Sequence, residues 1–286
     1  MPEALLEEGS ALHIEDAEFS LAIPDRSSAA RRPRYALAAS CQYRRRAYDL
    51  DLIIPALNEA QRIGKTVAAI SQQLETSGFA SRITVVDNGS VDATAAALDR
   101  LHLATPVRVM SCRTRGKGAA VRAGILQSTA RYVGYCDADL STPVGSIPDA
   151  LTRLEAGAAV VIGSRRCAGA GYEVPQPFVR RVGSRVFNRA SASLVGGLTD
   201  TQCGLKLMRG DLGREIFSQM QMEGFAFDVE LIARLLRRDT DVHELPIRWS
   251  NDEASTFNVV SDGVRAFQDV FLVRRMLRKS HNYANR

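Results

Sequence analysis

The fold is indicated by residues 50–90, which read LDLIIPALNEAQRIGKTVAAISQQLETSGFASRITVVDNGS. Two short apolar runs, Leu50–Ile54 and Ile83–Val86, have the length and composition of buried strands. Between them Gly78 supplies a helix stop, and the residues that recur at the spacing of one helix face are Ile63, Val67, Ile70 and Leu74. The stretch therefore predicts a strand, a helix and a second strand in succession.

The same alternation continues along the chain. The other strand-like runs are Val107–Met110, Tyr132–Cys136, Ala159–Ile162 and the shorter Gly204–Met208. A further helix is expected between the second and third strands, where Ala95, Leu98 and Leu101 recur at helical spacing. Strands that alternate with helices predict an α/β fold, with a doubly wound, mostly parallel sheet flanked by helices.

Composition limits the class of protein. The chain has 286 residues, of which 45% are hydrophobic and 24% charged, as in ordinary soluble globular proteins. Its net charge of +5 suits anionic substrates but is too small to predict binding to nucleic acid. The five scattered cysteines indicate reduced thiols, and no apolar run approaches the ~20 residues of a membrane helix. We therefore expect a cytoplasmic protein.

The chain is expected to have three parts. Residues 1–48 combine acidic residues, a basic run and weak periodicity, which predicts a partly disordered extension. Residues 49–250 carry the strand and helix pattern of the main domain. Residues 251–286 form an amphipathic helical segment that by default packs on the sheet, with a peripheral contact at the inner face of a membrane as the alternative. The oligomeric state is left open.

Acidic side chains follow three of the predicted strands at the point where each strand ends. Glu59 follows the first strand, Asp87 the second, and Asp137 and Asp139 the fourth. In an open parallel sheet, ligands bind outside the carboxyl ends of the strands. Four carboxylates are therefore expected along one edge of the sheet, where a ligand would bind.

Asp137 and Asp139 are separated by a single residue. At the end of an extended segment, side chains at i and i+2 share a face, so both carboxylates can approach one cation. Mg²⁺ and Mn²⁺ prefer oxygen ligands and often link carboxylates to substrate phosphates. Two solvated aspartates in a surface turn are the alternative, but the position after a buried strand favours a metal site that holds a diphosphate.

Two neighbouring segments also admit two interpretations. Asp87 either forms a turn or caps a helix, or it accepts a hydrogen bond from a nucleobase or ribose hydroxyl. In the run Arg115-Gly-Lys-Gly118, the glycines would let the backbone approach a ligand, while Lys117 and the next helix N-terminus would favour phosphate. The Walker spacing is absent. Beside the acidic edge, this basic loop is expected to neutralise a diphosphate.

Seven motifs follow one another between residues 50 and 250, and they read IPALNEAQRI, VVDNGSVDAT, RGKGAAVRAGI, YCDADLSTP, VIGSRR, DTQCGLKLM and GFAFDVELI. In this order they resemble the family 2 inverting glycosyltransferases, and within them the dolichyl-phosphate or polyprenyl-phosphate glucosyltransferase group. The resemblance implies a GT-A type fold with a Rossmann-like nucleotide-sugar domain at residues 49–250. It also implies hexosyl transfer, with glucose favoured, from a UDP-sugar to a polyprenyl or dolichyl phosphate, with Mg²⁺ or Mn²⁺ as cofactor.

The resemblance assigns roles residue by residue. The nucleotide-sugar site matches Pro55, Leu57, Glu59, Asp87, Lys117, Asp137, Ala138 and Asp139. Within that set, Asp137 and Asp139 match the metal and diphosphate motif, and Asp87 the base contact. The residues bordering the acceptor and the donor sugar match Arg165, Asp200, Gln202 and Lys206. Two positions depart from the family pattern, because Leu57 replaces an aromatic residue and Asn88 a second aspartate, and the membrane helices of many lipid-acceptor relatives are missing.

The expected reaction is a single displacement that inverts the anomeric carbon, with the metal and Lys117 neutralising the leaving diphosphate. A lipid monophosphate is already anionic and needs positioning by arginines more than a base. A soluble alcohol, such as a secondary metabolite, would need its proton removed, and Asp200 is the candidate base unless it is a structural carboxylate. Arg180, Arg181 and Arg185 either bind an acceptor phosphate or form a solvated helix face.

Other classes fit less well. A nucleotidyltransferase would place a glycine-rich, arginine-containing loop directly after the first strand, and a dehydrogenase would place Gly-x-Gly-x-x-Gly there. The segment from Pro55 to Glu59 has neither. A non-catalytic lipid or partner adaptor with a degenerate transferase fold remains the alternative from a different class, and the intact acidic motifs count against it.

Overall fold

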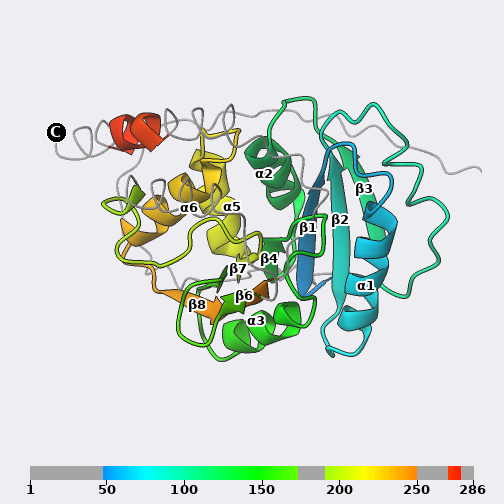
Figure 1. Ribbon diagram of the computed structural model, residues 1–286, viewed down its shortest axis with the longest axis horizontal. Coiled ribbons are helices and arrows are strands. Elements are labelled where there is room, and N and C mark those ends of the chain that lie inside the picture. The colour runs from blue at the N-terminus through cyan, green and yellow to red at the C-terminus, as the bar shows by residue number, and fades with distance from the viewer. Residues whose placement is uncertain (1–47, 173–190, 250–269, 278–286) are drawn as a thin grey trace, which may run out of the picture. The chain divides into compact units, whose positions relative to one another are not determined.

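The fold is organised by a sheet whose strand order reverses beside the first strand. The computed structural model describes residues 48–172, 191–249 and 270–277, and every structural statement below concerns these residues (Figure 1). The strands are β1 Leu50–Ala56, β2 Ser81–Asp87, β3 Val107–Ser111, β4 Tyr132–Tyr135, β5 Val160–Ser164, β6 Gly171–Tyr172, β7 Lys206–Arg209, β8 Val242–Pro246 and β9 Arg248–Trp249. The helices are α1 Ile63–Glu75, α2 Lys117–Gln127, α3 Ser146–Glu155, α5 Gly210–Gln219 and α6 Phe227–Leu236.

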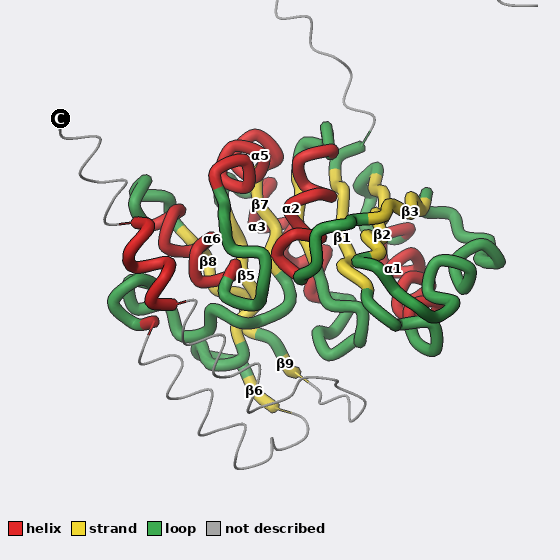
Figure 2. The backbone as a smooth tube through the Cα atoms, turned by 90° about the horizontal axis from the view of Figure 1, so that it is seen from above, coloured by secondary structure: helices red, strands yellow, loops and turns green. Residues whose placement is uncertain are grey.

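Seven strands form the main sheet in the order β3-β2-β1-β4-β7-β5-β8. β7 is antiparallel to its neighbours β4 and β5, and the other neighbouring strands are parallel. β4 and β5 therefore run in the same direction as β1 and β2, and their carboxyl ends share one edge. β6 and β9 form a separate parallel pair, which Figure 2 shows lying apart from the main sheet. The predicted mostly parallel α/β sheet is confirmed.

Helices cover both faces of this sheet (Figure 1). The apolar sides of α1 and α3 pack on one face, with Val67, Ile70 and Leu151 among the buried residues. α2, α5 and α6 pack on the other face, where residues 270–277 also contribute buried side chains. Burial on both faces explains why the strand segments are continuous apolar runs rather than alternating ones.

The expected strands and the helix α1 are confirmed, but the helix expected around Ala95 and Leu98 is wrong. Residues 94–100 form turns instead. Thr94 Oγ1 accepts a hydrogen bond of 2.8 Å from the Glu59 amide, and Asp92 Oδ2 accepts one of 3.2 Å from the Ala60 amide. These bonds anchor the start of the segment to the loop after β1, so the two side chains are not used to begin a helix.

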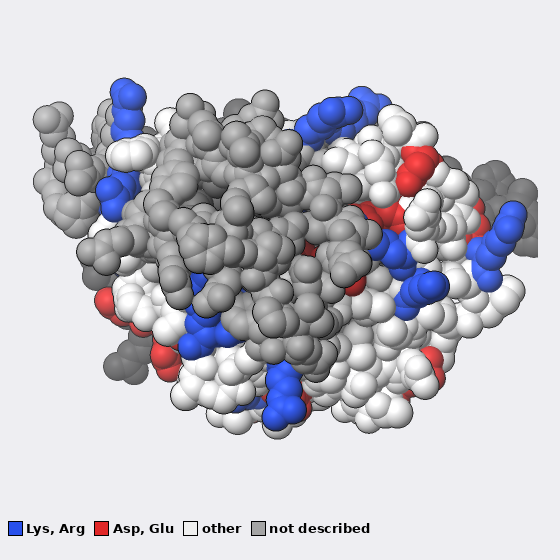
Figure 3. Space-filling model, viewed as in Figure 1, with Lys and Arg blue, Asp and Glu red and all other residues white. Residues whose placement is uncertain are grey.

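Two features of the surface bear on the sequence predictions. Among the residues that the structure describes, no helix is long and apolar enough to cross a membrane. Acidic and basic side chains are interspersed on the face drawn in Figure 3. All but the last residue of the predicted extension at 1–48 lies outside the described ranges, as do the arginines at 180, 181 and 185 and most of the predicted segment 251–286.

Candidate active site

The parallel strands place the predicted acidic residues along one edge of the sheet. Ala56 at the end of β1 pairs with Asp87 at the end of β2, and β4 runs parallel to β1. Glu59 lies three residues beyond β1, and Asp137 and Asp139 lie just beyond β4. The four carboxylates that the sequence predicts therefore follow strand ends at the same edge of the sheet.

Asp137 is paired with Lys117, the first residue of α2. Lys117 Nζ lies 2.5 Å from Asp137 Oδ1. Burial, the largest single influence, would raise the pKa of the Asp137 carboxyl, but the charge and hydrogen bond of Lys117 and the charges of Lys206 and Arg165 together lower it. Burial would lower the pKa of Lys117, but Asp137 and Asp228 raise it to about 12. Both groups are therefore charged near pH 7, and this carboxylate already has a cationic partner.

Gly204 leaves space for the Asp137 carboxylate. A Cβ atom at residue 204 would lie 2.5 Å from Asp137 Cγ and closer still to Oδ2, far inside ordinary contact distance. Only glycine therefore lets Asp137 rest against the backbone that leads into β7. This close approach sets the position of the carboxylate on one side.

The turn that carries Asp139 is anchored at two points. Thr66 Oγ1 on α1 donates a hydrogen bond of 2.6 Å to the Ala138 carbonyl, and the Ser141 amide donates one of 3.0 Å to Asp139 Oδ1. Leu140 has a φ of 57°, in the left-handed region, which turns the chain directly after Asp139. Ala138 thus acts through its backbone, by fixing the turn between the two aspartates.

The donor set at this edge fits Mg²⁺ or Mn²⁺ better than a metal that prefers nitrogen or sulfur. Across the described ranges, no group of three or more His, Cys, Asp or Glu side chains is placed to hold a metal ion. A cation at Asp137 and Asp139 would therefore complete its coordination with water and with oxygens of a diphosphate. Mg²⁺ is commonly bound in this way, through one or two carboxylates and substrate phosphates.

Asn88, directly after β2, holds the loop in front of α2. Its side-chain oxygen accepts a hydrogen bond of 2.7 Å from the Gly116 amide. Its side-chain nitrogen donates to the carbonyls of Thr114, at 2.7 Å, and Cys112, at 3.3 Å. Asn88 is only 4% exposed, and an ionised aspartate could not donate either bond. Asn88 therefore positions the loop that leads to Lys117. Its replacement of the family's second aspartate does not only remove a charge; it also supplies a hydrogen-bond donor.

Asp87 takes part in a turn that joins the loops after β1 and β2. Its Oδ1 accepts hydrogen bonds from the amide and the hydroxyl of Ser90. Ser90 Oγ accepts a hydrogen bond of 2.9 Å from the Asn58 amide, and Asn58 Oδ1 accepts one of 2.9 Å from the Val91 amide. The turn-forming interpretation is observed, and contact with a nucleobase stays a prediction.

The two glycines at the start of α2 face neighbouring protein atoms. A Cβ at Gly116 would lie 2.7 Å from the carbonyl carbon of Glu223, and a Cβ at Gly118 would lie 2.6 Å from the Met222 carbonyl oxygen. The Ala119 amide donates a hydrogen bond of 3.2 Å to the Glu223 carbonyl. The glycines thus admit the segment between α5 and α6, and part of the helix N-terminus is satisfied within the chain.

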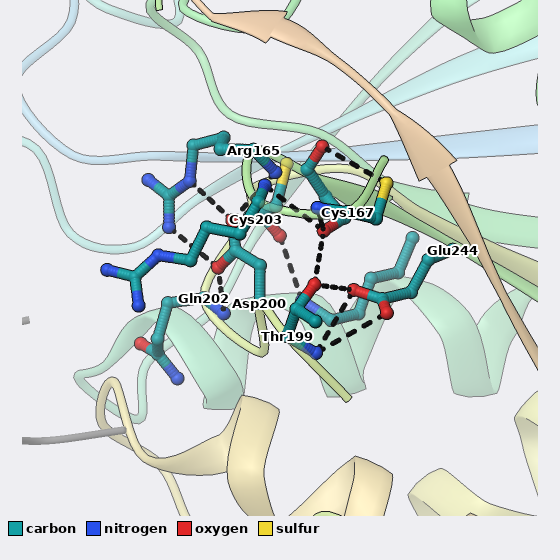
Figure 4. Close-up of polar contacts among 10 residues, drawn as sticks. Arg165, Cys167, Thr199, Asp200, Gln202, Cys203 and Glu244 are labelled. Carbon is teal, nitrogen blue, oxygen red and sulfur yellow. Dashed lines mark hydrogen bonds and ion pairs between the residues drawn. The ribbon is translucent and has the colours of Figure 1, made fainter. Parts of the chain in front are cut away.

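Arg165 and Asp200 form a bidentate ion pair beside the same edge (Figure 4). Arg165 follows β5, and its Nε and Nη2 atoms lie 2.6 and 2.8 Å from the two carboxylate oxygens of Asp200. The backbone amides of Arg165 and Gln202 add hydrogen bonds of 3.0 and 3.1 Å. Burial would raise the pKa of Asp200, but these partners lower it to about 2.

This environment argues against the base role that the sequence suggested for Asp200. Both of its oxygens accept hydrogen bonds, and a carboxylate with a pKa near 2 is a weak base at neutral pH. Its structural role, the alternative interpretation, fits better. Gln202 supports the same turn through its amide, and its buried side-chain nitrogen makes no hydrogen bond within the part of the chain that the structure describes.

Lys206 does not reach the surface of the site, contrary to the expected contact with a sugar. Its side chain is fully buried. Its Nζ atom lies 2.6 Å from Asp228 Oδ1 and donates a hydrogen bond of 2.8 Å to the Cys203 carbonyl. A direct contact between Lys206 and a sugar would require breaking this buried ion pair.

The segment after β1 is partly open. Pro55 lies within β1, Leu57 is 48% exposed, and the Glu59 carboxylate pairs with Arg62. Leu57 therefore presents an apolar side chain at the site, while Glu59 acts through a charge pair within the chain.

Residues 51–209, more than half of the chain, match the family model described as glycosyl transferase family 2. The chain belongs to this family. A dolichyl-phosphate beta-glucosyltransferase of Drosophila melanogaster is 30% identical over 241 residues, covering 79% of this chain and 74% of the relative. One of Dictyostelium discoideum is 28% identical, covering 79% and 73%. A solved structure of glucosyl-3-phosphoglycerate synthase from Mycobacterium tuberculosis, in complex with Mn²⁺, UDP-glucose and phosphoglyceric acid, has a TM-score of 0.60 at 17% identity and covers 79% of each chain.

Sequence reasoning missed two residues of this family 2 glycosyltransferase that lie next to the site. Tyr135 precedes Asp137 by two residues and was assigned only to a strand, and Asp228 lies in a helix near the end of the matched motifs. The Tyr135 hydroxyl donates a buried hydrogen bond to the Asp228 carboxylate. The motif GFAFDVELI offered a signal, because an acidic residue between apolar residues of one helix has to find a buried partner.

Proposed function

We propose that this chain is an inverting glucosyltransferase that moves glucose from UDP-glucose to a polyprenyl or dolichyl phosphate, using Mg²⁺ or Mn²⁺ held by Asp137 and Asp139. The observation that carries the proposal is the pair of carboxylates at the end of β4, set beside Lys117 at the edge where parallel strands end. Relatives whose names specify glucosyl transfer to dolichyl phosphate align over 79% of the chain.

Several residues support binding of a nucleotide diphosphate. Lys117 supplies a positive charge next to Asp137, and Asn88 holds the loop that leads to it. When the sugar–phosphate bond breaks, negative charge grows on the leaving diphosphate, and a bound divalent cation would neutralise it as a Lewis acid. Lys117 adds to this stabilisation. Asp87 and the exposed Leu57 border the space proposed for the nucleoside.

The state of Asp200 supports a phosphate acceptor over an alcohol. A lipid monophosphate is already anionic near pH 7, so its oxygen can attack the anomeric carbon without a base. Asp200 is committed to Arg165 and has a pKa of about 2, which suits a residue that orients an arginine. In the proposed reaction, Arg165 is held in place by Asp200 and contributes positive charge beside the incoming phosphate. Because the acceptor is a membrane lipid, the reaction would take place at a membrane surface.

A donor-by-acceptor screen tests this function. The full chain would be incubated with Mn²⁺ and radiolabelled UDP-glucose, UDP-N-acetylglucosamine or GDP-mannose, each with dolichyl phosphate in detergent or with soluble hydroxyl compounds such as 3-phosphoglycerate. Label should enter the organic phase only with UDP-glucose and dolichyl phosphate, as a β-linked product. Asp149→Ala changes an exposed acidic residue in the first turn of α3, away from the strand-end carboxylates, and should retain activity.

Two other outcomes would indicate a different function for this chain. Label on a soluble hydroxyl compound alone would overturn the phosphate acceptor and restore the need for a base. A folded chain that neither binds nor hydrolyses any sugar nucleotide would indicate a non-catalytic adaptor.

A further inference from the structure

Three buried side chains from three separate elements meet beneath the Asp137–Lys117 pair. They are Tyr135 at the end of β4, Lys206 at the start of β7 and Asp228 in α6. The relative exposure of the first two is 0% and that of Asp228 is 3%. Asp228 Oδ1 accepts hydrogen bonds from the Tyr135 hydroxyl and, at 2.6 Å, from Lys206 Nζ. We call these three residues the buried triad.

Burying the charges of the triad costs desolvation free energy that a purely structural contact would not require. A buried ion pair often contributes no more stability than apolar residues of the same volume, because both charges lose their hydration. The ammonium of Lys206 lies 5.4 Å from the Tyr135 ring centroid and donates to the Cys203 carbonyl at 2.8 Å. Its charge is thus held by an acid, a carbonyl and an aromatic ring. Such an arrangement calls for a role beyond packing.

The contacts of Lys206 lead directly to the metal carboxylate. The Cys203 carbonyl that Lys206 holds belongs to the peptide that continues into Gly204. Gly204 is the residue against which the Asp137 carboxylate rests, since even a Cβ there would lie 2.5 Å from Asp137 Cγ. β7 also pairs with β4 so that Lys206 lies opposite Tyr135. The triad therefore fixes both the backbone before Asp137 and the backbone beneath its carboxylate.

The charges of Lys206 and Asp228 also affect the pKa values of Asp137 and Lys117. Burial by itself would raise the pKa of Asp137, while Lys117 and then Lys206 lower it. Burial would likewise lower the pKa of Lys117, while Asp137 and then Asp228 raise it. Lys206 thus favours the charged form of Asp137, and Asp228 favours the charged form of Lys117.

We infer that Tyr135, Lys206 and Asp228 are positioning residues that hold the Asp137 carboxylate in the geometry needed for a divalent cation and its diphosphate. The inference rests on the proposed function, because it takes Asp137 as a metal ligand. None of the three touches the reacting atoms. Asp228 orients the Lys206 ammonium, Lys206 holds the Cys203 carbonyl, and the Gly204 backbone that follows supports Asp137.

Binding of Mn²⁺ to the full chain, measured by electron paramagnetic resonance, separates this role from packing. Asp228→Asn keeps the shape of the side chain and removes its charge, and Tyr135→Phe removes a single hydroxyl. Asp51→Asn is the matched control, because Asp51 is also a buried carboxylate, 1% exposed, bonded to an arginine and a hydroxyl at the opposite edge of the sheet. Thermal unfolding of each variant reports the structural cost.

Asp228→Asn should weaken Mn²⁺ binding about tenfold or more and Tyr135→Phe several-fold, while Asp51→Asn binds Mn²⁺ as the wild type does despite a similar loss of thermal stability. Wild-type Mn²⁺ affinity in both triad variants would overturn the inference, as would equal losses in Asp51→Asn and Asp228→Asn, or a wild-type chain that binds no Mn²⁺. Glucosyl transfer is measured separately. A wild type whose Mn²⁺ binding is weakened by the triad variants as predicted, but which transfers no glucose, would refute the proposed function alone.

Discussion

Replacing Gly204 by alanine should disable the site while leaving the fold intact. The new Cβ would lie 2.5 Å from Asp137 Cγ, whereas ordinary contacts begin at 3.4 Å. The backbone of Gly204 is outside the positive-φ region, so alanine itself introduces no conformational strain there. The Asp137 carboxylate is the movable partner. It should shift by about 1 Å and lose its contact with Lys117.

That shift sets the expected magnitude. A misplacement of about 1 Å at a reacting group lowers a rate about 100-fold, which corresponds to ~2.7 kcal/mol of transition-state stabilisation. Stability should change by less than ~1 kcal/mol, since alanine also reduces the conformational freedom of the unfolded chain. The Gly204→Ala variant should therefore show a rate about 100-fold lower at a nearly unchanged melting temperature.

The assay is transfer of radiolabelled glucose from UDP-glucose, with Mn²⁺ titrations and thermal unfolding on the same samples. Gly64→Ala in α1 is the matched control, because its Cβ would lie at an ordinary 3.8 Å from the nearest atom, the Ala97 carbonyl oxygen. It should retain wild-type transfer and Mn²⁺ affinity. Full activity in Gly204→Ala, or a loss explained entirely by unfolding, would show that the Gly204 backbone does not set the position of Asp137.

Three further predictions follow from single contacts. Asn88→Asp loses two donated hydrogen bonds, so unfolding in urea should show a loss of about 2 kcal/mol and UDP binding should weaken. Lys117→Met removes a cation 2.5 Å from Asp137, so Mn²⁺ alone should bind several-fold more tightly while calorimetry shows weaker binding of UDP with Mn²⁺. Asp200 has a lowered pKa, about 2 against 3.8. Its contribution to the free energy of unfolding, about 2 kcal/mol, is therefore complete above a pH of about 4 and lost as pH falls towards 2. Unfolding measured across a pH series should show this loss.

Each of these has a contradicting result. Unchanged stability in Asn88→Asp would mean that the amide does not hold the loop. Weaker binding of Mn²⁺ alone in Lys117→Met would mean that the lysine helps to build the cation site. Asp200→Asn is the control for the pH series, and an acid-dependent loss as large as in the wild type would assign the effect to other carboxylates.

The sheet and its ligand edge could be predicted because the deciding signals are local in the sequence. Buried strands such as β1 and β4 are continuous apolar runs, and the acids at their ends follow within a few residues. Parallel order then brings Asp87 and Asp137 to one edge. The turn segment after Asp92 was mistaken for a helix because its apolar spacing is helical, while its hydrogen bonds to the loop after β1 depend on the folded structure.

Other features of the site depend on contacts between distant residues. Tyr135 and Asp228 are 93 positions apart, and no spacing rule connects them. A lysine such as Lys206 normally extends into solvent, so its burial was not predictable from the residue type. From the sequence, Asn88 was described only as replacing a charged aspartate. In the structure its side-chain amide acts as a hydrogen-bond donor and as an acceptor at the same time. Such pairings become visible only when the strands are assembled.

We propose that Asp137 and Asp139 hold the cation that assists departure of UDP from glucose. The most direct measurement compares wild type and Asp139→Ala for Mn²⁺-dependent transfer of glucose from UDP-glucose to dolichyl phosphate, with circular dichroism as the check on folding. We expect transfer by the wild type that stops on addition of EDTA and returns with Mn²⁺, and a folded variant at least about 1,000-fold less active. Equal transfer by the folded variant, or wild-type transfer that persists in EDTA, would show that transfer does not depend on a cation held by Asp137 and Asp139.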